Sequence, residues 1–282
     1  MKREKSRIFL AAGILALTLC LLGFCRAFSL TVTRYTIRSA AFTQPLTIVQ
    51  LSDLHCAVYG QDNAQLLAEV AAAQPDLIVM TGDIINQDAD AGQVEAMVQL
   101  TAELSALAPA CFSLGNHEVA YCEAHGDDLC DAIAAAGATV LEQDYVEQTI
   151  GGQRLRIGGI YGYVLSENLR SGAEQDFVRA FTDTALPTVL LCHIPEGLLS
   201  YGSIDSWAVD LVFSGHAHGG QIRLPGIGGL YDPETGWFPE YTRGVFQRSG
   251  SAVVLSAGLG TSIRIPRFNN PPELVVVSIE PA

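Results

Sequence analysis

Basic residues are scarce in this sequence. Its 282 residues include 16 Lys and Arg against 30 Asp and Glu, which gives a formal net charge of −14 at neutral pH. This balance repels the phosphate backbones of nucleic acids unless bound metal ions reverse the charge locally. We therefore expect no nucleic acid as a partner.

Internal repeats, linkers and low-complexity segments are also absent after the N-terminal region. Hydrophobic residues make up 49% of the chain, which excludes a disordered protein and is enough for a substantial core. One compact domain over residues 28–282 is the simplest organisation.

Charged side chains are missing from residues 8–25 as well. At ~1.5 Å per residue this apolar run spans ~27 Å, close to the ~30 Å hydrocarbon core of a bilayer. It is longer than the apolar region of an ordinary signal peptide, and no Ala-x-Ala pattern follows it. Residues 1–27 are therefore predicted to be a retained single-pass membrane anchor. Because four basic residues precede the run, the N-terminus is expected in the cytoplasm and the remaining chain outside it.

The cysteines define no clear framework. Cys20 and Cys25 lie in the apolar run, and neither follows the small residue of a lipoprotein cleavage site. Of the five others, an odd number that cannot all pair, Cys122 and Cys130 flank a polar loop. A disulfide between these two outside the cell and two free thiols remain alternatives.

Short apolar strands alternate with helices in the first half of the chain, and strands dominate the second half. This alternation indicates an α/β protein with polar residues gathered at the strand ends. A hairpin turn is expected at Gly151-Gly152. Strands are predicted at 28–38, 46–52, 77–80, 110–114, 146–150, 154–160, 189–193, 208–213, 251–256 and 274–279, and helices at 63–73, 94–107, 127–136 and 168–181.

Potential metal ligands occur at the ends of these strands. His216 and His218 follow the apolar run 208–213, and in extended backbone an i, i+2 pair points to one face. Asp53 and His55 repeat the same spacing after another strand. The full set is Asp53, His55, Asp83, Asn116, His193, His216 and His218, with His117 beside them, and it contains five of the six histidines of the chain.

This donor set favours two divalent transition-metal ions. Imidazole, carboxylate and amide oxygen suit Mn, Fe or Zn, and seven ligands would crowd a single ion. Since only a carboxylate bridges well, either Asp53 or Asp83 would join the two ions. Two ions ~3.5–4 Å apart can activate a shared water and clamp a phosphoryl group during in-line attack, so hydrolysis of a phosphate ester is the expected reaction.

The same motifs resemble those of the calcineurin-like metallophosphoesterases, in the same order over residues ~46 to 280. Membrane-anchored bacterial phosphoesterases with a Gly-His-x-His-Gly-Gly-Gln-x-Arg-x-Pro motif look most similar, matched here from Gly215 to Pro225. The motifs are Asp53-x-His55, Gly82-Asp83, Gly115-Asn116-His117-Glu118, His193 and Gly215-His216-Ala217-His218. The resemblance implies two facing mixed β-sheets flanked by α-helices.

The resemblance also assigns roles to the residues. It implies that Asp53, His55 and His218 hold one metal ion, that Asn116, His193 and His216 hold the other, and that Asp83 bridges them. His117 matches the family's non-ligand histidine, which steadies the transition state or protonates the leaving oxygen.

Three arginines are candidates for contact with a substrate anion. Arg223 belongs to the shared motif, and Arg264 lies in a segment, residues 258–273, that resembles the family's C-terminal signature. For Arg267 a surface ion pair is favoured.

Where relatives often carry an acidic residue after the strand at 154–160, this chain has Tyr161-Gly162-Tyr163. Cys56 and Cys192, which lie next to ligands, are expected to be small core residues because neighbours in a strand point away.

The sequence thus predicts a phosphoesterase at the membrane that acts on a diester, pyrophosphate or monoester, and the resemblance implies a lipid-linked or cell-wall substrate. Two alternatives are a non-catalytic binding module of the same fold and an extracellular nuclease. Scaffold members of the family usually lack metal ligands or the non-ligand histidine, whereas all are present here.

Overall fold

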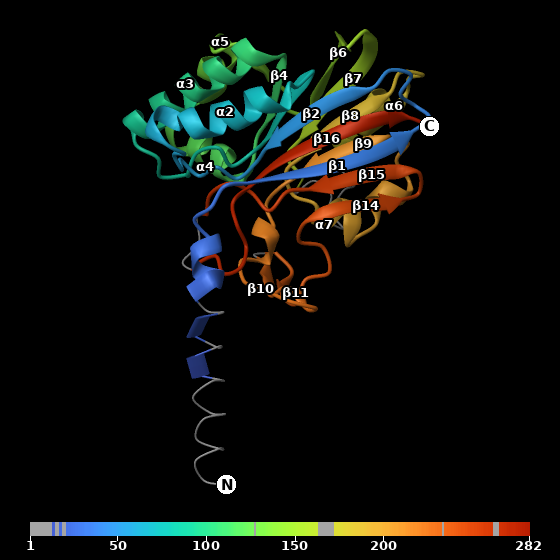
Figure 1. Ribbon diagram of the computed structural model, residues 1–282. Coiled ribbons are helices and arrows are strands. Elements are labelled where there is room, and N and C mark those ends of the chain that lie inside the picture. Colours follow the sequence, from blue (N-terminus) through green and yellow to red (C-terminus); the bar gives the residue numbers. More distant parts are fainter. Residues whose placement is uncertain are drawn as a thin grey trace, which may run out of the picture.

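Two six-stranded β-sheets face each other, and helices cover their outer faces (Figure 1). The computed structural model describes residues 13–14, 17–18, 21–126, 128–162, 172–232, 234–261 and 265–282. Each sheet contains parallel and antiparallel neighbours. The prediction of an α/β fold with two mixed sheets and flanking helices is confirmed.

The first sheet is built from both ends of the chain. Its order is β1 (Thr31–Ser39), β16 (Glu273–Pro281), β2 (Leu46–Leu51), β3 (Leu77–Thr81), β4 (Ala110–Ser113) and β5 (Thr139–Val140). Only β16 and β2 pair antiparallel. The helices on this side are α2 (Ala64–Ala73), α3 (Ala91–Leu107), α4 (Asn116–His125) and α5 (Asp128–Ala135).

The second sheet comes from the later part of the chain. Its order is β14 (Gly244–Arg248), β15 (Ser251–Leu255), β9 (Leu211–Ser214), β8 (Thr188–Cys192), β7 (Gln153–Ile160) and β6 (Asp144–Ile150). The predicted turn at Gly151-Gly152 joins β6 to β7, with both glycines at positive φ. Two helices lie beside this sheet, α6 (Gly172–Thr182) and the short α7 (Glu196–Leu199). Residues 163–171, where we expected the start of α6, lie outside the described residues.

Alternation of side chains along the strands explains the layers. In β3, Leu77 and Val79 enter the core between the two sheets, whereas Ile78 and Met80 pack against the helices. In β8, Leu191 enters the same central core. A fully buried aliphatic side chain contributes ~1.5–3 kcal/mol, so strands that are apolar on both faces favour a sheet covered on both sides.

Two small hairpins extend the fold below the sheets. They are β10 (Arg223–Leu224) with β11 (Gly228–Gly229), and β12 (Tyr231–Asp232) with β13 (Gly236–Trp237). They lie at the end of the domain from which the N-terminal helix leaves (Figure 1). Strands of two residues carry no periodic signal, and the sequence analysis did not predict them.

The predicted anchor is only partly covered by the described residues. Residues 21–26 are helical, while residues 1–12 lie outside the described part. Among the described residues there is no helix with the length and apolar character needed to span a bilayer. No disulfide joins Cys122 to Cys130, two described residues; their side chains are instead hydrogen-bonding neighbours.

Candidate metal centre

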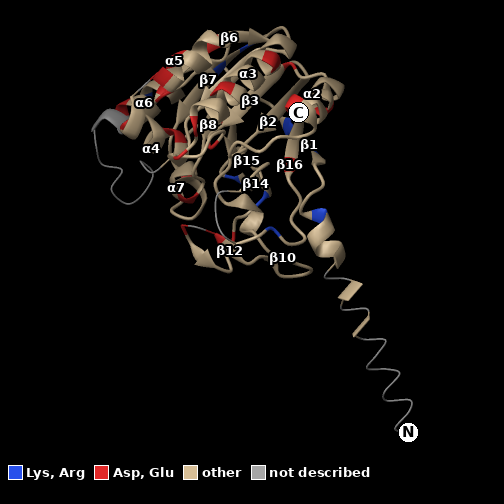
Figure 2. Ribbon diagram, turned by 90° about the vertical axis from the view of Figure 1, so that its left-hand side faces the viewer, with Lys and Arg blue, Asp and Glu red and all other residues tan. Residues whose placement is uncertain are grey.

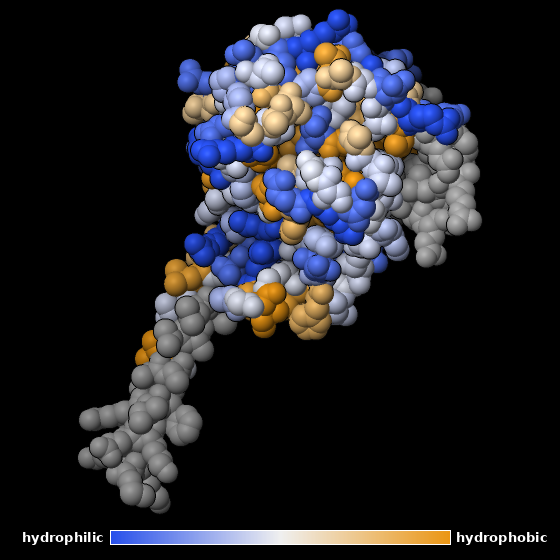
Figure 3. All heavy atoms as spheres, turned by 90° about the vertical axis from the view of Figure 1, so that its right-hand side faces the viewer, coloured by the Kyte–Doolittle hydropathy of each residue, from blue (hydrophilic) through white to orange (hydrophobic). Residues whose placement is uncertain are grey.

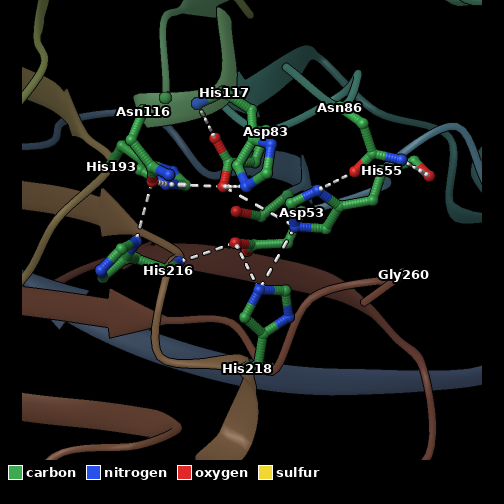
Figure 4. A network of polar contacts seen from close by, with 12 residues as sticks. Asp53, His55, Asp83, Asn86, Asn116, His117, His193, His216, His218 and Gly260 are labelled. Atoms are coloured by element: carbon green, nitrogen blue, oxygen red, sulfur yellow. Dashed lines mark hydrogen bonds and ion pairs between the residues drawn. The ribbon is translucent and has the colours of Figure 1, made fainter. Parts of the chain in front are cut away.

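The predicted ligands come together where strands of both sheets end. Asp53 and Asp83 follow β2 and β3 of the first sheet, and Asn116 opens α4 directly after β4. His193 and His216 follow β8 and β9 of the second sheet. Parallel strands bring their carboxyl ends to one edge of a sheet, and the two facing sheets bring both edges to one site (Figure 4).

The backbone at this site is not extended, so the geometric argument for side chains on one face of a strand is wrong. Asp53 and His55 have φ of 51° and 49°, and His216 and His218 have φ of 68° and 46°. Each pair lies in a tight turn beyond the end of its strand. Left-handed backbone at a non-glycine residue costs ~1–3 kcal/mol and clusters at functional sites. The spacing still brings each pair into one site, through a turn.

Three side chains form the first ligand group. His55 Nε2 and His218 Nε2 lie 3.2 Å apart, and His218 Nε2 lies 3.7 Å from Asp53 Oδ1. All three side chains are almost completely buried. Their ligand atoms all lie within 4.8 Å of one another, a separation that a single ion can span.

The second ligand group lies on the other side of Asp83. Asn116 Oδ1 is 3.2 Å from His193 Nε2 and 3.1 Å from His216 Nδ1. Asp83 Oδ2 is 3.3 Å from His193 Nε2 and 3.6 Å from His55 Nε2, so one carboxylate reaches both groups. This is the position that a bridging ligand requires. Asp53 does not have it, because its Oδ1 accepts from the backbone N–H of His216 and lies beside the ring of His218.

Neighbouring groups fix the ring orientations of the histidines. His55 Nδ1 lies 3.1 Å from Asn86 Oδ1, and His193 Nδ1 lies 2.7 Å from the Thr81 carbonyl oxygen. Since both neighbours only accept, each Nδ1 carries a proton and each Nε2 is directed to the site. His216 has the opposite arrangement, with Nδ1 in the site and Nε2 3.4 Å from Glu234 Oε1.

The electrostatics of the site favour a bound cation. Burial lowers the pKa of His55 to about 3 and lowers that of His218 well below its usual value, so both rings are neutral. Burial also disfavours a charge on His193, but the Asp83 carboxylate outweighs this and raises the pKa of His193 to about 10. The space between Asp83 and His193 therefore attracts positive charge.

The donor set fits the divalent metal ions that the motifs imply. Asp53 Oδ2 is buried and has no hydrogen-bond partner among the described residues. An unpaired buried carboxylate oxygen is costly, and an ion beside it would remove that cost. Together with neutral imidazoles and an amide oxygen, it makes a site suited to Mn, Fe or Zn. Metal binding by these seven residues remains a prediction.

His117 lies at the edge of the site. The backbone N–H of Gln87 donates to its Nδ1 at 3.0 Å, which leaves the ring proton on Nε2. That nitrogen is 4.0 Å from Asp83 Oδ2, and the backbone N–H of His117 donates to Asp83 Oδ1 at 2.9 Å. His117 thus presents a ring N–H to the site.

Glu118 holds two ligand loops together, a role that the sequence analysis missed. Its buried carboxylate accepts hydrogen bonds from the backbone N–H groups of Asp83, Ile84, Ile85 and Gly115. Burial raises the pKa of Glu118 to about 7 despite these bonds. In the sequence, this role could have been predicted from the Glu that ends the Gly-Asn-His-Glu motif.

Glycine is required beside the two aspartates for steric reasons. A Cβ atom at Gly115 would collide with Asp83 Oδ1, and one at Gly215 would collide with Ser52 Oγ and Asp53 Oδ2. The glycine of each motif therefore leaves room for the carboxylate of another motif.

The arginines are arranged differently from the prediction. Arg267, expected at the surface, is only 6% exposed, and its Nη2 lies 3.4 Å from His218 Nδ1. Arg223 lies away from the ligands and donates to the Gly219 carbonyl oxygen and to Thr242. Arg264 lies outside the described residues. The arginine beside the candidate metal centre is thus Arg267.

The cysteines next to the ligands are not ligands in this geometry. Cys192 packs in the core between the second sheet and its helices, as predicted. Cys56 is partly buried and packs against the helical side of the first sheet. Cys56 has a φ of 59°, so it is not in a strand, and the reason given for its packing was wrong. Its partly buried position nevertheless agrees with the expected core residue.

Comparison with known proteins identifies the family. The sequence profile described as calcineurin-like phosphoesterase matches residues 46–220. The chain is 30% identical to an uncharacterized metallophosphoesterase of Aquifex aeolicus, covering 89% of this chain and 92% of the relative. It is 28% identical to the uncharacterized metallophosphoesterase YkuE of Bacillus subtilis (88% and 85% covered). It is 27% identical to the UDP-2,3-diacylglucosamine pyrophosphatase LpxG of Chlamydia trachomatis (82% and 83% covered). The chain is therefore a member of the calcineurin-like phosphoesterase family and a metal-dependent phosphoric ester hydrolase.

Proposed function

We propose that this enzyme is a binuclear phosphoesterase that cleaves a phosphodiester or pyrophosphate bond of a lipid-linked substrate. The observation that carries the binuclear part is the position of Asp83, whose Oδ2 lies within 3.6 Å of His55 Nε2 in one ligand group and His193 Nε2 in the other. Two bound divalent ions would activate a water and neutralise the charge of the phosphoryl group.

A groove supports the lipid-linked part of the proposal. It has a volume of about 480 Å³ and runs from Ala27 and Phe28, at the base of the N-terminal helix, to His55 of the metal centre. Its other lining residues include apolar side chains as well as Arg267. A substrate with an acyl chain and a phosphate would place the chain toward Phe28 and the phosphate toward His55. The relative LpxG is named for a substrate that carries two acyl groups.

The protein groups have separate tasks in this proposal. Arg267 Nη1 is buried without a hydrogen-bond partner among the described residues, which leaves one guanidinium N–H group available for a phosphate oxygen. The ring proton of His117 lies on Nε2, because Nδ1 already accepts from the backbone N–H of Gln87. His117 therefore stabilises transition-state charge as a hydrogen-bond donor and does not transfer its proton to the leaving group.

Hydrolysis of bis-p-nitrophenyl phosphate by the full chain with added Mn²⁺ tests the first part. Asp83→Asn and His216→Ala should each abolish turnover with little change in the circular dichroism spectrum. Arg38→Gln, which changes a surface arginine paired with Glu280, is the matched control and should keep full activity. A wild-type chain that is shown to hold two metals but hydrolyses no phosphate ester would instead be a binding module.

A comparison of substrates tests the second part. The enzyme should cleave a diacylated sugar pyrophosphate with a higher kcat/KM than the same sugar pyrophosphate without acyl chains. Val58→Asp, which adds a charge to an exposed residue of the groove, should reduce that preference and leave cleavage of bis-p-nitrophenyl phosphate unchanged. Equal kcat/KM for both pyrophosphates would contradict a lipid-linked substrate.

A further inference from the structure

A second cluster of arginines lies away from the metal centre. Arg26, Arg223 and Arg243 line a pocket of about 840 Å³ together with Ser29, Thr31 and Asn269. Every basic residue after Arg7 in this chain is an arginine, and the whole chain carries a net charge of −14. The pocket therefore concentrates three basic residues in a protein that is acidic overall.

The surrounding protein neutralises these arginines only in part. Among the described residues, Arg223 forms no ion pair; it donates only to the Gly219 carbonyl oxygen and to Thr242. Arg243 has one carboxylate nearby, Glu273, at 3.4 Å. Burial and then the charge of Arg243 lower the pKa of Arg223, while Glu273 and Tyr35 act in the opposite direction. The pocket thus has an unbalanced positive charge, and an anion would relieve it.

Exposed apolar side chains lie at the same end of the domain as this pocket, and one of them, Ile227, lines it. Ile227 is 62% exposed at the turn between β10 and β11, and Trp237 and Phe238 are 66% and 68% exposed on the second hairpin. Phe28, next to the N-terminal helix, is also strongly exposed. The hairpins are joined by a hydrogen bond from Phe238 N–H to the Leu230 carbonyl oxygen.

The N-terminal helix belongs to the same face. The Phe24 ring packs edge-on against Phe268 with ring centroids 5.3 Å apart, and Phe268 bridges to Ile222 beside β10. Asn269 N–H donates to the Gly23 carbonyl oxygen. We call the three arginines, Phe28, Ile227, Trp237 and Phe238 the basal face. Figure 2 shows basic groups between β14, β10 and the helix, and Figure 3 shows hydrophobic groups at this lower end of the domain.

We infer that the basal face docks the domain on a bilayer surface and that its arginine pocket binds the phosphate of an anionic phospholipid headgroup. Arginine matches a phosphate with paired N–H donors, and aromatic side chains such as Trp237 prefer the interface between headgroups and acyl chains. The chemistry points to a lipid, because the anion site and the apolar tips share one face. Docking is independent of hydrolysis, so it can hold or fail whatever the outcome for the proposed reaction.

Docking would also orient the active site. The groove that reaches His55 begins at Ala27 and Phe28, directly beside Arg26 of the basal face. A lipid-linked phosphate could then move from the bilayer into the groove without crossing bulk water.

Fluorescence of Trp237 gives a direct test in the full chain reconstituted into vesicles. The vesicles contain phosphatidylcholine with brominated acyl chains, either alone or with 30% phosphatidylglycerol. We expect phosphatidylglycerol to increase the quenching of the tryptophan emission. Trp237→Phe should remove the quenched part of the emission and leave only the emission of Trp207. Quenching that is the same with and without phosphatidylglycerol would overturn the headgroup site, and no quenching at all would overturn docking.

Variants separate docking from simple attachment through the N-terminal segment. Arg26→Gln and Arg223→Gln should each reduce the ratio of docked to undocked domain about fivefold, the effect of about 1 kcal/mol per basic residue near an anionic surface. Arg154→Gln, which removes an exposed arginine from β7, is the matched control and should change nothing. Ile227→Ser has an exposed site, so it should fold normally, keep turnover of bis-p-nitrophenyl phosphate and lose quenching. Normal quenching in all three basal-face variants would refute the inference.

Discussion

His55 Nε2 and His218 Nε2 lie 3.2 Å apart although the two residues are 163 positions apart in the sequence. Two neutral rings at this distance would share one proton or one cation. Asn86 decides which nitrogen of His55 is directed to this contact, because its Oδ1 accepts from Nδ1.

Loss of Asn86 should therefore weaken metal binding without unfolding the protein. Asn86→Ala removes the acceptor for His55 Nδ1–H, and residues that orient a histidine ligand in this way typically change metal affinity by ~10–100-fold. Competition with a chromophoric chelator would measure the affinity. Gln99→Ala, on the exposed side of α3, is the control. Unchanged affinity in Asn86→Ala would mean that the ring is held by its packing alone.

Glu118→Gln should destabilise the whole site. The amide can accept at only one end, so two of the four backbone N–H groups that now donate to the carboxylate lose their acceptor. With ~1–3 kcal/mol for each of the two buried unsatisfied groups, we expect a loss of ~2–6 kcal/mol in the free energy of unfolding. Urea unfolding would measure it. Glu123→Gln, an exposed position of the same helix, should have no effect, and a similar loss in both variants would contradict the proposed role.

His117→Ala should reduce kcat by ~10²–10³-fold if the ring acts as a hydrogen-bond donor in the transition state. The loss should be the same for a p-nitrophenyl ester and for an alkyl ester, because donation to a non-leaving oxygen does not depend on the leaving group. A much smaller loss with the p-nitrophenyl ester would identify His117 as the acid that protonates the leaving oxygen. Steady-state kinetics with both esters decide between these roles.

Removal of metal should lower the thermal stability. Ions that bind only the folded chain add ~2.7 kcal/mol per site at a hundredfold excess over the dissociation constant. A chelator should therefore lower Tm, and Mn²⁺ should restore it in the wild type. In Asp83→Asn the shift should be much smaller. An identical Tm with and without chelator would argue against metal binding at this site.

Glu147 provides a pH-dependent contribution to stability far from the metal centre. The hydrogen bond from Arg156 holds the pKa of Glu147 below its ordinary value of 4.5. Its ion pairs thus stabilise the fold above pH ~4.5 and are lost as the pH falls through the lower folded value. Glu147→Gln should be less stable than the wild type at pH 7, and this difference should shrink as the pH falls below ~4.5. Urea unfolding across this pH range would show this, and a difference that does not change with pH would contradict it.

Periodicity predicted the alternation of strands and helices, the resemblance of the motifs implied the two facing sheets, and the residues predicted as ligands lie together in the structure. The backbone at the ligands was not predictable in this way, because positive φ at Asp53 and His216 depends on turns packed against other loops. The helix α4, Asn116–His125, was not predicted, because the motif at its start also reads as a loop after a strand. The burial of Arg267 results from carbonyl groups of Ala257 and Gly260, which tertiary folding brings around it.

The strand order also constrains how the chain reaches its native state. β16, the last strand of the chain, lies between β1 and β2 and pairs with both. A nascent chain whose β16 has not yet left the ribosome cannot complete the first sheet, whose β2 leads into the loop of Asp53 and His55. The metal centre can therefore assemble only after β16 has been released, and removal of residues 273–282 would take away an interior strand and with it the frame for Asp53.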